Sequence, residues 1–591
     1  MRSTLGEALA TLARRDGIAV LLFAAAVIAM TYPLAFQLGA GLPSDGGDIL
    51  TAHWQVWWLR EVVKSGHNAN FTPYLSYPNG MDVTFQPHPW TSLLAWGPLA
   101  LLFGDAAGYN LNTMLGLLVS AYGVYLLVRH LTGSRAAAWV SGAFYAFYPS
   151  HIFRVVRQPT TGSIQWFPFF LLALAVGLEG IAASEEPRGK LTPRGLALIV
   201  LAGLALSVNA YISIKPLIQV SLLGALYVSL AALTNGWWRN PAFWKAIGVL
   251  ALVSLLLVLP ILVPYLRAGT GLQEAIGQGA GSLSKHTADA VAYVRASPQL
   301  PLFTPRSLAG LTGMPFTDWE RGGIFYLGLT PIVLAVVGLI DVLGRNRRRL
   351  VWPIIAAVFW WLSLGTSLSF DGKRYPQIWL PYRLLETNPV FAAVRIPHRF
   401  SLGFSLPFAV LLGYGVVRLW EWLDGRRWLA PTAIAGLSLV MLFELALVPL
   451  TLTPLEVSPF YDQLRAEGTE GAIIDVPTGI GPAKRHMYLQ TIHHQPIVTG
   501  RIARMPEDAF DYIEANPLLQ GWREQTKPAC EMDLGQAIDD LLADGFRYVI
   551  VHNPAKHADW VAGYFPVEPV YRDDLIAVYT LSALRANPPC E

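Results

Sequence analysis

The sequence L-P-S-D-G-G-D-I-L-T-A-H-W-Q-V-W-W-L-R, residues 42–60, follows closely on an apolar run of helical length, Gly17–Phe36. Two carboxylates, Asp45 and Asp48, lie on its glycine-rich turn, and the aromatic residues after them recur at helical spacing. A spanning helix needs about 20 mostly apolar residues, and Gly17–Phe36 provides them. The stretch therefore predicts a membrane helix that leads into an acidic turn and then into a second helix, Ile49–Val63, along the membrane surface.

The composition of the whole chain agrees with a membrane protein. Of 591 residues, 53% are hydrophobic and only 14% are charged, and the mean hydropathy is +0.41. Soluble domains carry about 25% charged residues, and the 20 Trp, 23 Tyr and 26 Phe exclude a disordered chain. The formal net charge of +3 is too small for nucleic acid to be the main partner. We therefore expect an α-helical polytopic membrane protein that binds lipid and no nucleic acid.

Eleven apolar segments predict spanning helices, with boundaries uncertain by about 2–4 residues. With the N-terminus inside, every inner loop is basic, as in Arg345–Arg349, which is the bias expected of cytoplasmic loops. A further stretch, Thr91–Phe103, is too short to span, and we expect an interfacial or re-entrant helix there. The eleven segments are Gly17–Phe36, Leu111–Val128, Ala136–Phe147, Ile164–Gly180, Gly195–Ala210, Leu217–Leu233, Ala246–Pro264, Gly323–Val342, Val351–Leu368, Phe400–Val417 and Trp428–Leu450.

These patterns predict two domains: a transmembrane domain, residues 1–450, and a soluble extracytoplasmic α/β domain, residues 451–591. The first outer loop, residues 37–110, contains both interfacial helices. Both cysteines, Cys530 and Cys590, lie in the tail, where an oxidising outer location would let them pair, although their spacing also fits two unpaired thiols. In this tail we expect strands at Gly471–Val476, Pro496–Thr499, Arg547–His552 and Ile576–Leu581, and a helix at Leu534–Ala543.

Asp48 is the first candidate for a general base. A helix N-terminus favours a carboxylate, and partial desolvation beside tryptophans would raise its basicity toward working pH. Asp45 competes for this role, and a plain helix cap is the structural alternative for Asp48. The same outer loop carries Asp82, His53 and His88. Their spacing matches no metal motif, so no cofactor is predicted, and a divalent cation is left open.

Basic residues gather at outer helix ends, where the positive-inside rule makes them unusual. Pro397 fixes the backbone between two arginines, and arginine contacts phosphate bidentately. Contact with lipid head groups is the alternative role for such residues. The candidates are His151, Arg154 and Arg157 in H-I-F-R-V-V-R-Q, Tyr211 and Lys215 in Y-I-S-I-K, and Arg395, His398 and Arg399 in R-I-P-H-R.

Two further groups of basic residues are weaker candidates. One group lies in the outer loop after the seventh segment, and the other lies in the tail. The tail group includes a histidine pair beside a strand, which could bind an acceptor sugar or a metal. More often, such histidines are ordinary polar residues of loops and strand edges. No glycine-rich phosphate loop stands in the strand–loop–helix context that such a loop requires. The residues are Lys285, His286, Arg295 and Arg306 in the loop, and Arg485, His486, His493, His494 and Arg501 in the tail.

The layout resembles the membrane glycosyltransferases of the type-C (GT-C) superfamily. The resemblance lies in a first helix, a long acidic outer loop with two interfacial helices, the stretch G-D-A-A-G-Y-N-L-N-T from Gly104 before the second helix, and a soluble C-terminal domain. It implies a polyprenyl-phosphate-linked sugar donor and an aspartate that deprotonates an acceptor hydroxyl, with inversion at the anomeric carbon. Asp48 matches the position of that aspartate best. The acceptor is a glycan, a lipid or a protein, and the absence of W-W-D-Y-G argues against transfer to asparagine.

The resemblance places the protein in the plasma membrane of a bacterium or archaeon, with its tail on the outer side. Two other functions stay open. A lipid or polysaccharide transporter would usually show paired halves and broken helices, which this chain lacks. A catalytically silent assembly or binding protein is the third possibility, since a single aspartate carries most of the catalytic argument. The sugar, the acceptor and the oligomeric state are left open.

Overall fold

The computed structural model describes residues 5–43, 47–182, 191–269, 286–297, 300, 324–345, 347–392, 394, 396–424, 428–468 and 471–590. The chain divides into two compact units. The helical unit comprises Met1–Ser44 and Leu94–Leu452, and the sheet unit comprises Asp45–Leu93 and Thr453–Glu591. Most of the first outer loop is thus grouped with the tail.

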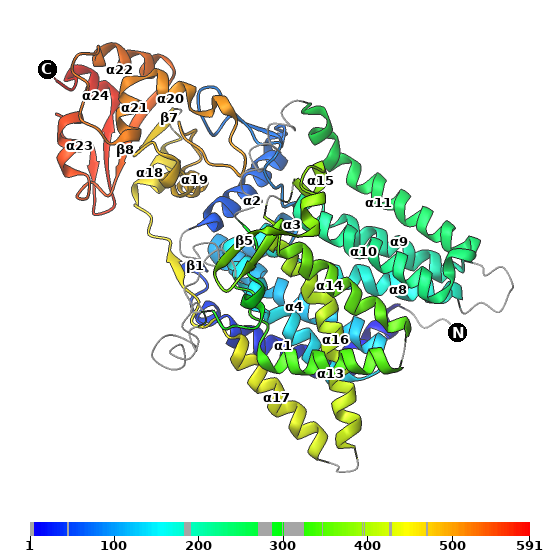
Figure 1. Ribbon diagram of the computed structural model, residues 1–591. Coiled ribbons are helices and arrows are strands. Elements are labelled where there is room, and N and C mark those ends of the chain that lie inside the picture. The colour runs from blue at the N-terminus through cyan, green and yellow to red at the C-terminus, as the bar shows by residue number, and fades with distance from the viewer. Residues whose placement is uncertain are drawn as a thin grey trace. The chain divides into compact units, whose positions relative to one another are not determined.

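Each of the eleven segments predicted to span overlaps a helix of the helical unit (Figure 1). By length and composition, five stretches of the described residues are apolar and long enough to cross a membrane: Asp105–Thr132, Pro159–Gly180, Ile214–Asn235, Pro241–Arg267 and Pro397–Leu423. The eleven helices are α1 (Leu5–Met30), α4 (Asp105–Thr132), α5 (Arg135–Phe147), α8 (Phe167–Ala182), α9 (Pro193–Ser207), α10 (Ile214–Asn235), α11 (Pro241–Arg267), α13 (Leu329–Arg345), α14 (Val351–Ser363), α16 (Phe400–Leu423) and α17 (Leu429–Leu445).

Shorter elements connect these helices. The expected helix at Thr91–Phe103 is present as α3 (Trp90–Phe103), and Leu94, Leu101 and Leu102 on it are exposed, as suits contact with lipid. The other short elements are η1 (Leu34–Phe36), β1 (Gly41–Pro43), α6 (Pro149–Arg157), α7 (Pro159–Gly162), η2 (Trp237–Arg239), η3 (Ala290–Tyr293), η7 (Arg347–Leu350), β4 (Ser367–Phe370), β5 (Lys373–Trp379), η8 (Pro381–Leu384), α15 (Pro389–Ala392), η9 (Pro397–Arg399) and β6 (Leu452–Pro454).

Helix α16 forms the centre of the helical unit, packed against α13, α14 and α5 (Figure 1). Its backbone approaches α13 closely, because a Cβ added at Gly415 would collide with the carbonyl oxygen of Leu334. Small residues permit this kind of close helix packing in membranes. By contrast, α11 runs beside α9 with exposed leucines, including Leu252 and Leu256, so the apolar surface of the unit faces outward there.

Local sequence signals set the starts of several helices. Thr192 accepts a hydrogen bond from the Gly195 N–H, and Asn240 accepts one from the Ala242 N–H. Each cap is followed by proline at the first helical position, where the missing N–H costs nothing. The helix α6 likewise begins with Pro149. The start of α6 places Arg154 and Arg157, which are discussed below, in its last turn.

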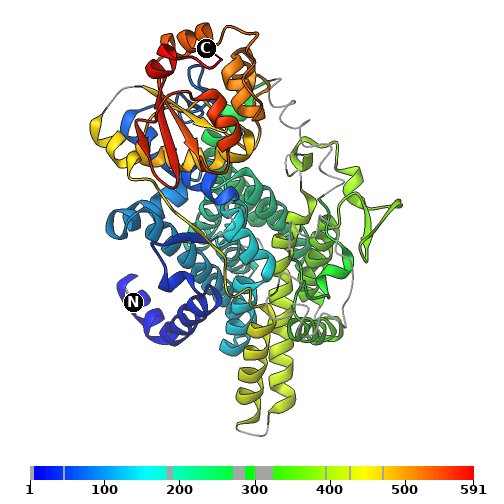
Figure 2. The same cartoon turned by 90° about the vertical axis from the view of Figure 1, so that its left-hand side faces the viewer.

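The sheet unit is built on a four-stranded mixed sheet in the order β7-β8-β10-β9 (Figure 2). Strand β7 (Ala472–Val476) pairs in parallel with β8 (Phe546–His552), which pairs antiparallel with β10 (Ile576–Thr580). These strands confirm three of the four predicted ones, and α22 (Leu534–Ala543) has the predicted bounds. The fourth, Pro496–Thr499, is not a strand and contributes only a bridge between Ile497 and Ile473.

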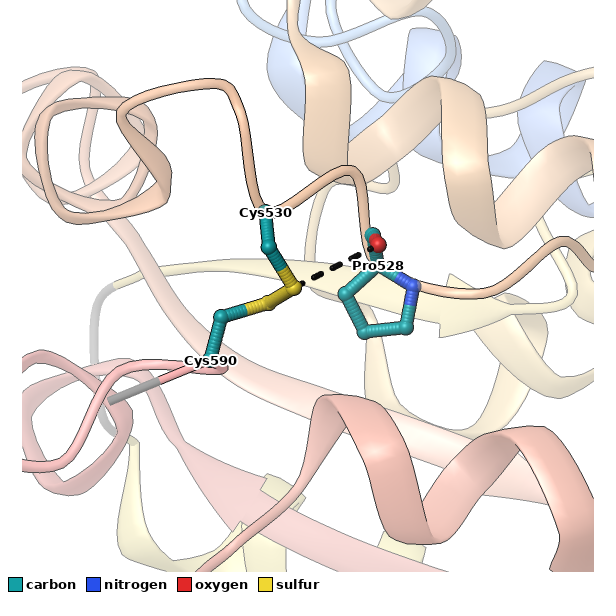
Figure 3. Close-up of a disulfide and its surroundings, with 3 residues drawn as sticks. All are labelled: Pro528, Cys530 and Cys590. Atoms are coloured by element: carbon teal, nitrogen blue, oxygen red, sulfur yellow. Dashed lines mark hydrogen bonds between the residues drawn. A yellow bond between two sulfur atoms is a disulfide. The ribbon is translucent and has the colours of Figure 1, made fainter.

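The remaining elements of the sheet unit are helices and short strands. They are α2 (Asp48–Ser65), β2 (Phe71–Thr72), β3 (Met81–Asp82), α18 (Phe460–Glu467), α19 (Ile480–His493), η10 (Glu507–Phe510), α20 (Asp511–Ala515), α21 (Pro517–Glu524), α23 (Ala558–Tyr564), β9 (Tyr571–Arg572) and α24 (Leu581–Ala586). A disulfide joins Cys530 and Cys590, whose Cα atoms are 5.6 Å apart (Figure 3). This bond decides between the two alternatives left open by the spacing of the cysteines.

The helix α2 is buried by contacts within the protein. All residues from Ile49 to Leu59 are buried, so this stretch presents no continuous apolar face outward. The helix instead packs on α19 of the same unit. Its tryptophans explain the burial, because they contact groups within the unit: the Trp54 indole N–H donates to Gln490 Oε1 at 2.7 Å, and Trp58 donates to the Ala69 carbonyl at 3.0 Å.

Candidate functional site

The helical unit contains a buried group of polar side chains that we call the basic cluster: Arg154, Gln158, His398 and Arg399. Arg154 lies in the last turn of α6, Gln158 follows that helix, and the other two lie in η9. The arginine residues are 3% and 5% exposed. Two of the three sequence regions predicted to carry outer cations are thus brought together, although Arg154 and His398 are 244 positions apart in the chain.

The Gln158 side chain joins the two arginines. Arg154 Nη1 donates to Gln158 Oε1 at 2.7 Å, and Arg399 Nη2 donates to the same oxygen at 3.3 Å. Arg154 Nη2 also contacts His398 Nε2, and Arg399 Nη1 donates to the Val394 carbonyl at 3.2 Å. One neutral oxygen therefore holds two guanidinium groups next to each other.

Neighbouring residues fix the histidine of the cluster. The His398 ring lies 5.4 Å from the Phe325 ring and 6.2 Å from the His286 ring, and the His398 backbone N–H donates to the His286 carbonyl. Nearby, the hydroxyls of Ser150 and Ser401 are 3.1 Å apart and connect α6 to α16. His286 is one of the weaker sequence candidates, and the structure places it against the cluster.

Two guanidinium groups at this position are suited to bind an anion. Arginine stays protonated in proteins and presents a planar set of donors that matches phosphate oxygens. Buried charge is costly unless it is paired or hydrogen-bonded. Two buried guanidinium groups held side by side match the oxygens of a phosphate, so the cluster has the chemistry of a phosphate site.

Other predicted outer residues have structural contacts. Each ring nitrogen of His151 lies 3.0 Å from a backbone carbonyl oxygen, Nδ1 from that of Tyr145 and Nε2 from that of Gly162. Arg157 lies over the Phe153 ring, and the Tyr211 hydroxyl donates to the Leu257 carbonyl at 2.8 Å. Arg395, Lys285 and Arg306 lie outside the described residues, and Arg295 pairs with Asp371.

Asp48 is the first residue of α2, and Gly47 occupies the cap position. The alternative that Asp48 is the helix cap is therefore wrong. Its Oδ1 lies 2.6 Å from Nζ of Lys484 on α19, and 49% of its side chain is exposed. The continuous burial of α2 begins at the next residue, Ile49. Asp45 lies outside the described residues.

Three contacts align α2 with α19. Asp48 pairs with Lys484, Trp54 with Gln490, and the Trp57 indole N–H lies 3.4 Å from His494 Nε2. The partners advance together along both helices, so the helices run parallel. Gln490 also donates to the Tyr74 carbonyl at 2.6 Å. The tail thereby fixes the start of the acidic loop.

The other candidates in this loop are tied into the sheet unit. Asp82 accepts a hydrogen bond from the Thr84 N–H at 2.7 Å and lines a pocket of about 310 Å³. His88 Nε2 lies 2.8 Å from the Ala69 carbonyl, and burial lowers the pKa of His88. The His53 ring is buried against Tyr488, with ring centroids 5.3 Å apart. The structure does not bring these three residues together around Asp48.

A second cluster lies on the sheet itself and comprises Asp475, His486 and His552. Burial raises the pKa of Asp475, but His486 and His552 have the opposite effect and outweigh it. The pKa of Asp475 is therefore lowered to about 2. Burial lowers the pKa of His486 to about 3. At neutral pH this cluster holds a carboxylate and a neutral imidazole. Sequence analysis singled out His486 alone; the signal for its partner was an aspartate inside the apolar strand A-I-I-D-V.

The tail candidates near this cluster have separate roles. His493 is buried with its ring stacked on Tyr461, and His494 contacts Trp57. Arg485 lines the pocket beside His486. Arg501 donates to the Ile480 carbonyl at 3.5 Å. The two neighbouring histidines therefore point in different directions: the His493 ring stacks on Tyr461, and the His494 ring contacts Trp57 of α2.

Comparison with known proteins gives a family and a fold. A family model described as "Domain of unknown function (DUF6311)" matches residues 19–440. No curated protein matches the sequence. Among solved structures, the archaeal oligosaccharyltransferase AglB from Archaeoglobus fulgidus, in complex with an inhibitory peptide and a dolichol-phosphate, is similar at TM-score 0.54 and 13% identity. That match covers 93% of this chain and 71% of the other.

The arabinofuranosyltransferase AftD from Mycobacteria is similar at TM-score 0.53 and 14% identity, over 96% of this chain and 41% of that one. These likenesses span nearly all of the chain. They show that it has the GT-C glycosyltransferase fold. The resemblance noted in the sequence is therefore confirmed at the level of fold.

Proposed function

Because the chain belongs to the DUF6311 family, whose description assigns no function, we propose from its fold and its basic cluster that it is a membrane glycosyltransferase. The donor is a sugar carried on a polyprenyl phosphate, and the acceptor is a hydroxyl at the outer face of the plasma membrane. The transfer inverts the anomeric carbon, and the lipid phosphate leaves. The observation that carries the proposal is the pair of buried guanidinium groups on Gln158.

The basic cluster supports a site for the leaving phosphate. Negative charge develops on the phosphate oxygens as the glycosidic bond breaks, and prearranged cations stabilise it best in a partly dry site. Arg154 and Arg399 are buried and already oriented by one shared oxygen. They therefore need little reorganisation to hold a phosphate.

Lys215 is the third cation that we assign to this site. Gln219 on α10 accepts a hydrogen bond from the Gly403 N–H on α16 at 3.0 Å. Lys215 precedes Gln219 by four residues, and Arg399 precedes Gly403 by four. In the predicted topology both helices begin at the outer side, so both cations lie one turn outward from the same contact. The shared direction of these helices would bring Lys215 near the arginines.

We assign Asp48 as the general base that deprotonates the acceptor hydroxyl, with Asp45 as its competitor. The N-terminus of α2 favours a carboxylate at this position, and the ion pair with Lys484 holds it in place. Exposure of half the side chain leaves it open to an incoming acceptor. Lys484 is then a positioning residue, since it touches the carboxylate and not the reacting atoms.

The disulfide supports an outer location for the tail. Disulfides persist in oxidising compartments and are rare in the cytoplasm, and Cys530–Cys590 lies in the sheet unit. Fusion of a reporter after Leu450 tests this placement. We expect activity from a reporter that works outside the cytoplasm. A reporter active only in the cytoplasm would require an even number of spans and would refute the topology.

Binding of a polyprenyl phosphate tests the phosphate site. Arg154→Gln and Arg399→Gln each remove one charged contact, which should cost about 1.5–3 kcal/mol in donor affinity, or roughly 10-fold or more. Arg383→Ala is the matched control, because Arg383 is an exposed arginine of the same outer region. Unchanged affinity in both cluster variants, with folded protein, would move the phosphate elsewhere.

A further inference from the structure

Two strands and one helix place Asp475, His486 and His552 together on one face of the sheet. Strand residues alternate between faces. Ile474 and Val476 of β7, and Val549 and Val551 of β8, belong to the apolar core on the other face. Asp475 and His552 therefore both point away from that core. Helix α19 supplies His486 to the same place.

The three side chains form a compact set of potential metal ligands. One ligand atom from each residue lies within 4.8 Å of the other two. His552 Nε2 is 2.7 Å from Asp475 Oδ1, and the His486 and His552 rings stack with centroids 4.7 Å apart. Asp475 is fully buried, and the His552 side chain is 12% exposed. A buried carboxylate between two imidazoles is the donor set of many protein metal sites.

Two atoms of the cluster lack hydrogen-bond partners among the described residues. They are Asp475 Oδ2 and His486 Nδ1. Leaving a buried polar atom unsatisfied costs about 1–3 kcal/mol, so such atoms in a native protein call for a ligand or a bound molecule. Both atoms belong to side chains that are almost completely buried. Two of the three residues that a metal would contact therefore have a buried polar atom without a hydrogen-bond partner among the described residues.

A pocket of about 340 Å³ gives access to the cluster. Its wall includes His486 and His552, and also the cations Arg485 and Lys556. Coordination positions not filled by protein would open into this pocket. Arginine and lysine beside them would attract an anionic ligand group to the same place.

We propose that Asp475, His486 and His552 bind a divalent transition metal ion of the Zn²⁺ class, with a fourth position open to the pocket. Zinc takes His nitrogen and carboxylate oxygen at about 2.0–2.2 Å, which places tetrahedral ligand atoms roughly 3.4 Å apart. The ligand atoms need to close by little more than about 1 Å from the observed separations. Rotation of the His486 ring provides this closure. Asp475 Oδ1 and His552 Nε2, which are 2.7 Å apart, instead separate by about 0.7 Å as two metal bonds replace their hydrogen bond.

The experiment uses the full-length protein in detergent, without a histidine tag and freed of metal by a chelator. Zn²⁺ is titrated in by calorimetry, and Co²⁺ is added as a spectroscopic probe of coordination. We expect one Zn²⁺ per chain, a visible Co²⁺ ligand-field band, and a higher unfolding temperature with Zn²⁺. Asp475→Asn and the double variant His486→Ala/His552→Ala should each weaken binding by about 100-fold or more.

His494→Ala is the matched control, because this histidine lies at the end of α19 and contacts Trp57 instead of the cluster. It should bind Zn²⁺ like the wild type. Asp475→Asn preserves the shape of the side chain, so retained folding can be checked by the disulfide and by the near-UV dichroism. Absence of stoichiometric binding by the wild type overturns the proposal. Undiminished binding by the double variant overturns it as well, because the metal then lies elsewhere.

Discussion

Asp48 and Lys484 are 436 positions apart in the chain, yet Lys484 Nζ lies 2.6 Å from Asp48 Oδ1. The lysine belongs to α19, which follows the first strand of the tail sheet, and the aspartate opens the helix after the acidic turn. A carboxylate assigned to catalysis from the first outer loop is thus held by the C-terminal part of the chain. This relationship gives the sheet unit a direct part in the proposed reaction.

Replacing Asp48 separates catalysis from stability. Asp48→Asn should lower the transfer rate about 10²–10⁴-fold, as loss of a positioned base does. Because solvent screens a half-exposed ion pair, the free energy of unfolding should change by less than about 1 kcal/mol. Lys484→Ala is the companion variant and should lower the rate by less than about 10-fold. Equal rates for Asp48→Asn and the wild type would remove Asp48 from the mechanism.

Gln158→Ala should lower kcat/KM for the donor, with a fall in kcat, because the guanidinium groups that it orients stabilise the charge that develops on the leaving phosphate. The amide oxygen orients both guanidinium groups, and a hydrogen bond to a charged group contributes about 1.5–3 kcal/mol. Steady-state kinetics over a range of donor concentrations gives the two constants separately. Asn235→Ala removes an amide hydrogen bond at the other end of α10 and serves as the control. An unchanged kcat/KM in folded Gln158→Ala would assign Gln158 a purely structural role.

The sequence predicted the helices well because their signals are local. Apolar length and proline or glycine at the ends depend on a few neighbouring residues, as at Pro193 and Pro241. The helix Leu534–Ala543 has its predicted bounds for the same reason. The contacts of α2 were not predictable, since Trp54 binds a side chain 436 positions away in the chain.

The candidate sites were predictable only in part. Arg154, His398 and Arg399 stood out as cations at outer helix ends, but nothing in the sequence identified Gln158 as their common partner. Asp475 was missed because a single polar residue in a buried strand resembles ordinary sequence variation. These contacts depend on long-range packing, which a local pattern does not report.

Removing the disulfide should destabilise the tail. The sequence separation of Cys530 and Cys590 is 60 residues, and the loss of chain entropy on closing such a loop corresponds to about 4 kcal/mol. We expect Cys530→Ser/Cys590→Ser to lower the free energy of unfolding by about 2–4 kcal/mol. Urea unfolding followed by tryptophan fluorescence measures it. Reductant should reproduce the effect in the wild type and leave the variant unchanged; no effect in either case would contradict a structural role for the bond.

Acid should weaken the sheet unit through His88. Burial lowers the pKa of His88 in the folded protein, so the unfolded chain takes up its proton first as the pH falls. The free energy of unfolding should therefore decrease below about pH 6.5, by up to about 1.4 kcal/mol per pH unit until the folded pKa is reached. His88→Gln keeps a donor for the Ala69 carbonyl and removes this titration. Urea midpoints between pH 7.5 and 5 should fall less in the variant; parallel curves would refute the assignment.

Release of polyprenyl phosphate in membranes tests the proposed glycosyltransferase activity most directly, because this product is the same whichever acceptor takes the sugar. Membranes containing the protein are supplied with a panel of polyprenyl-phosphate sugars, and free polyprenyl phosphate and glycosylated products are measured. We predict that one donor is consumed by the wild type and by Arg383→Ala, and that its consumption is lost in Arg154→Gln/Arg399→Gln and in Asp48→Asn. Consumption that continues unchanged in both of these variants would contradict the account, as would a wild type that consumes none of the donors.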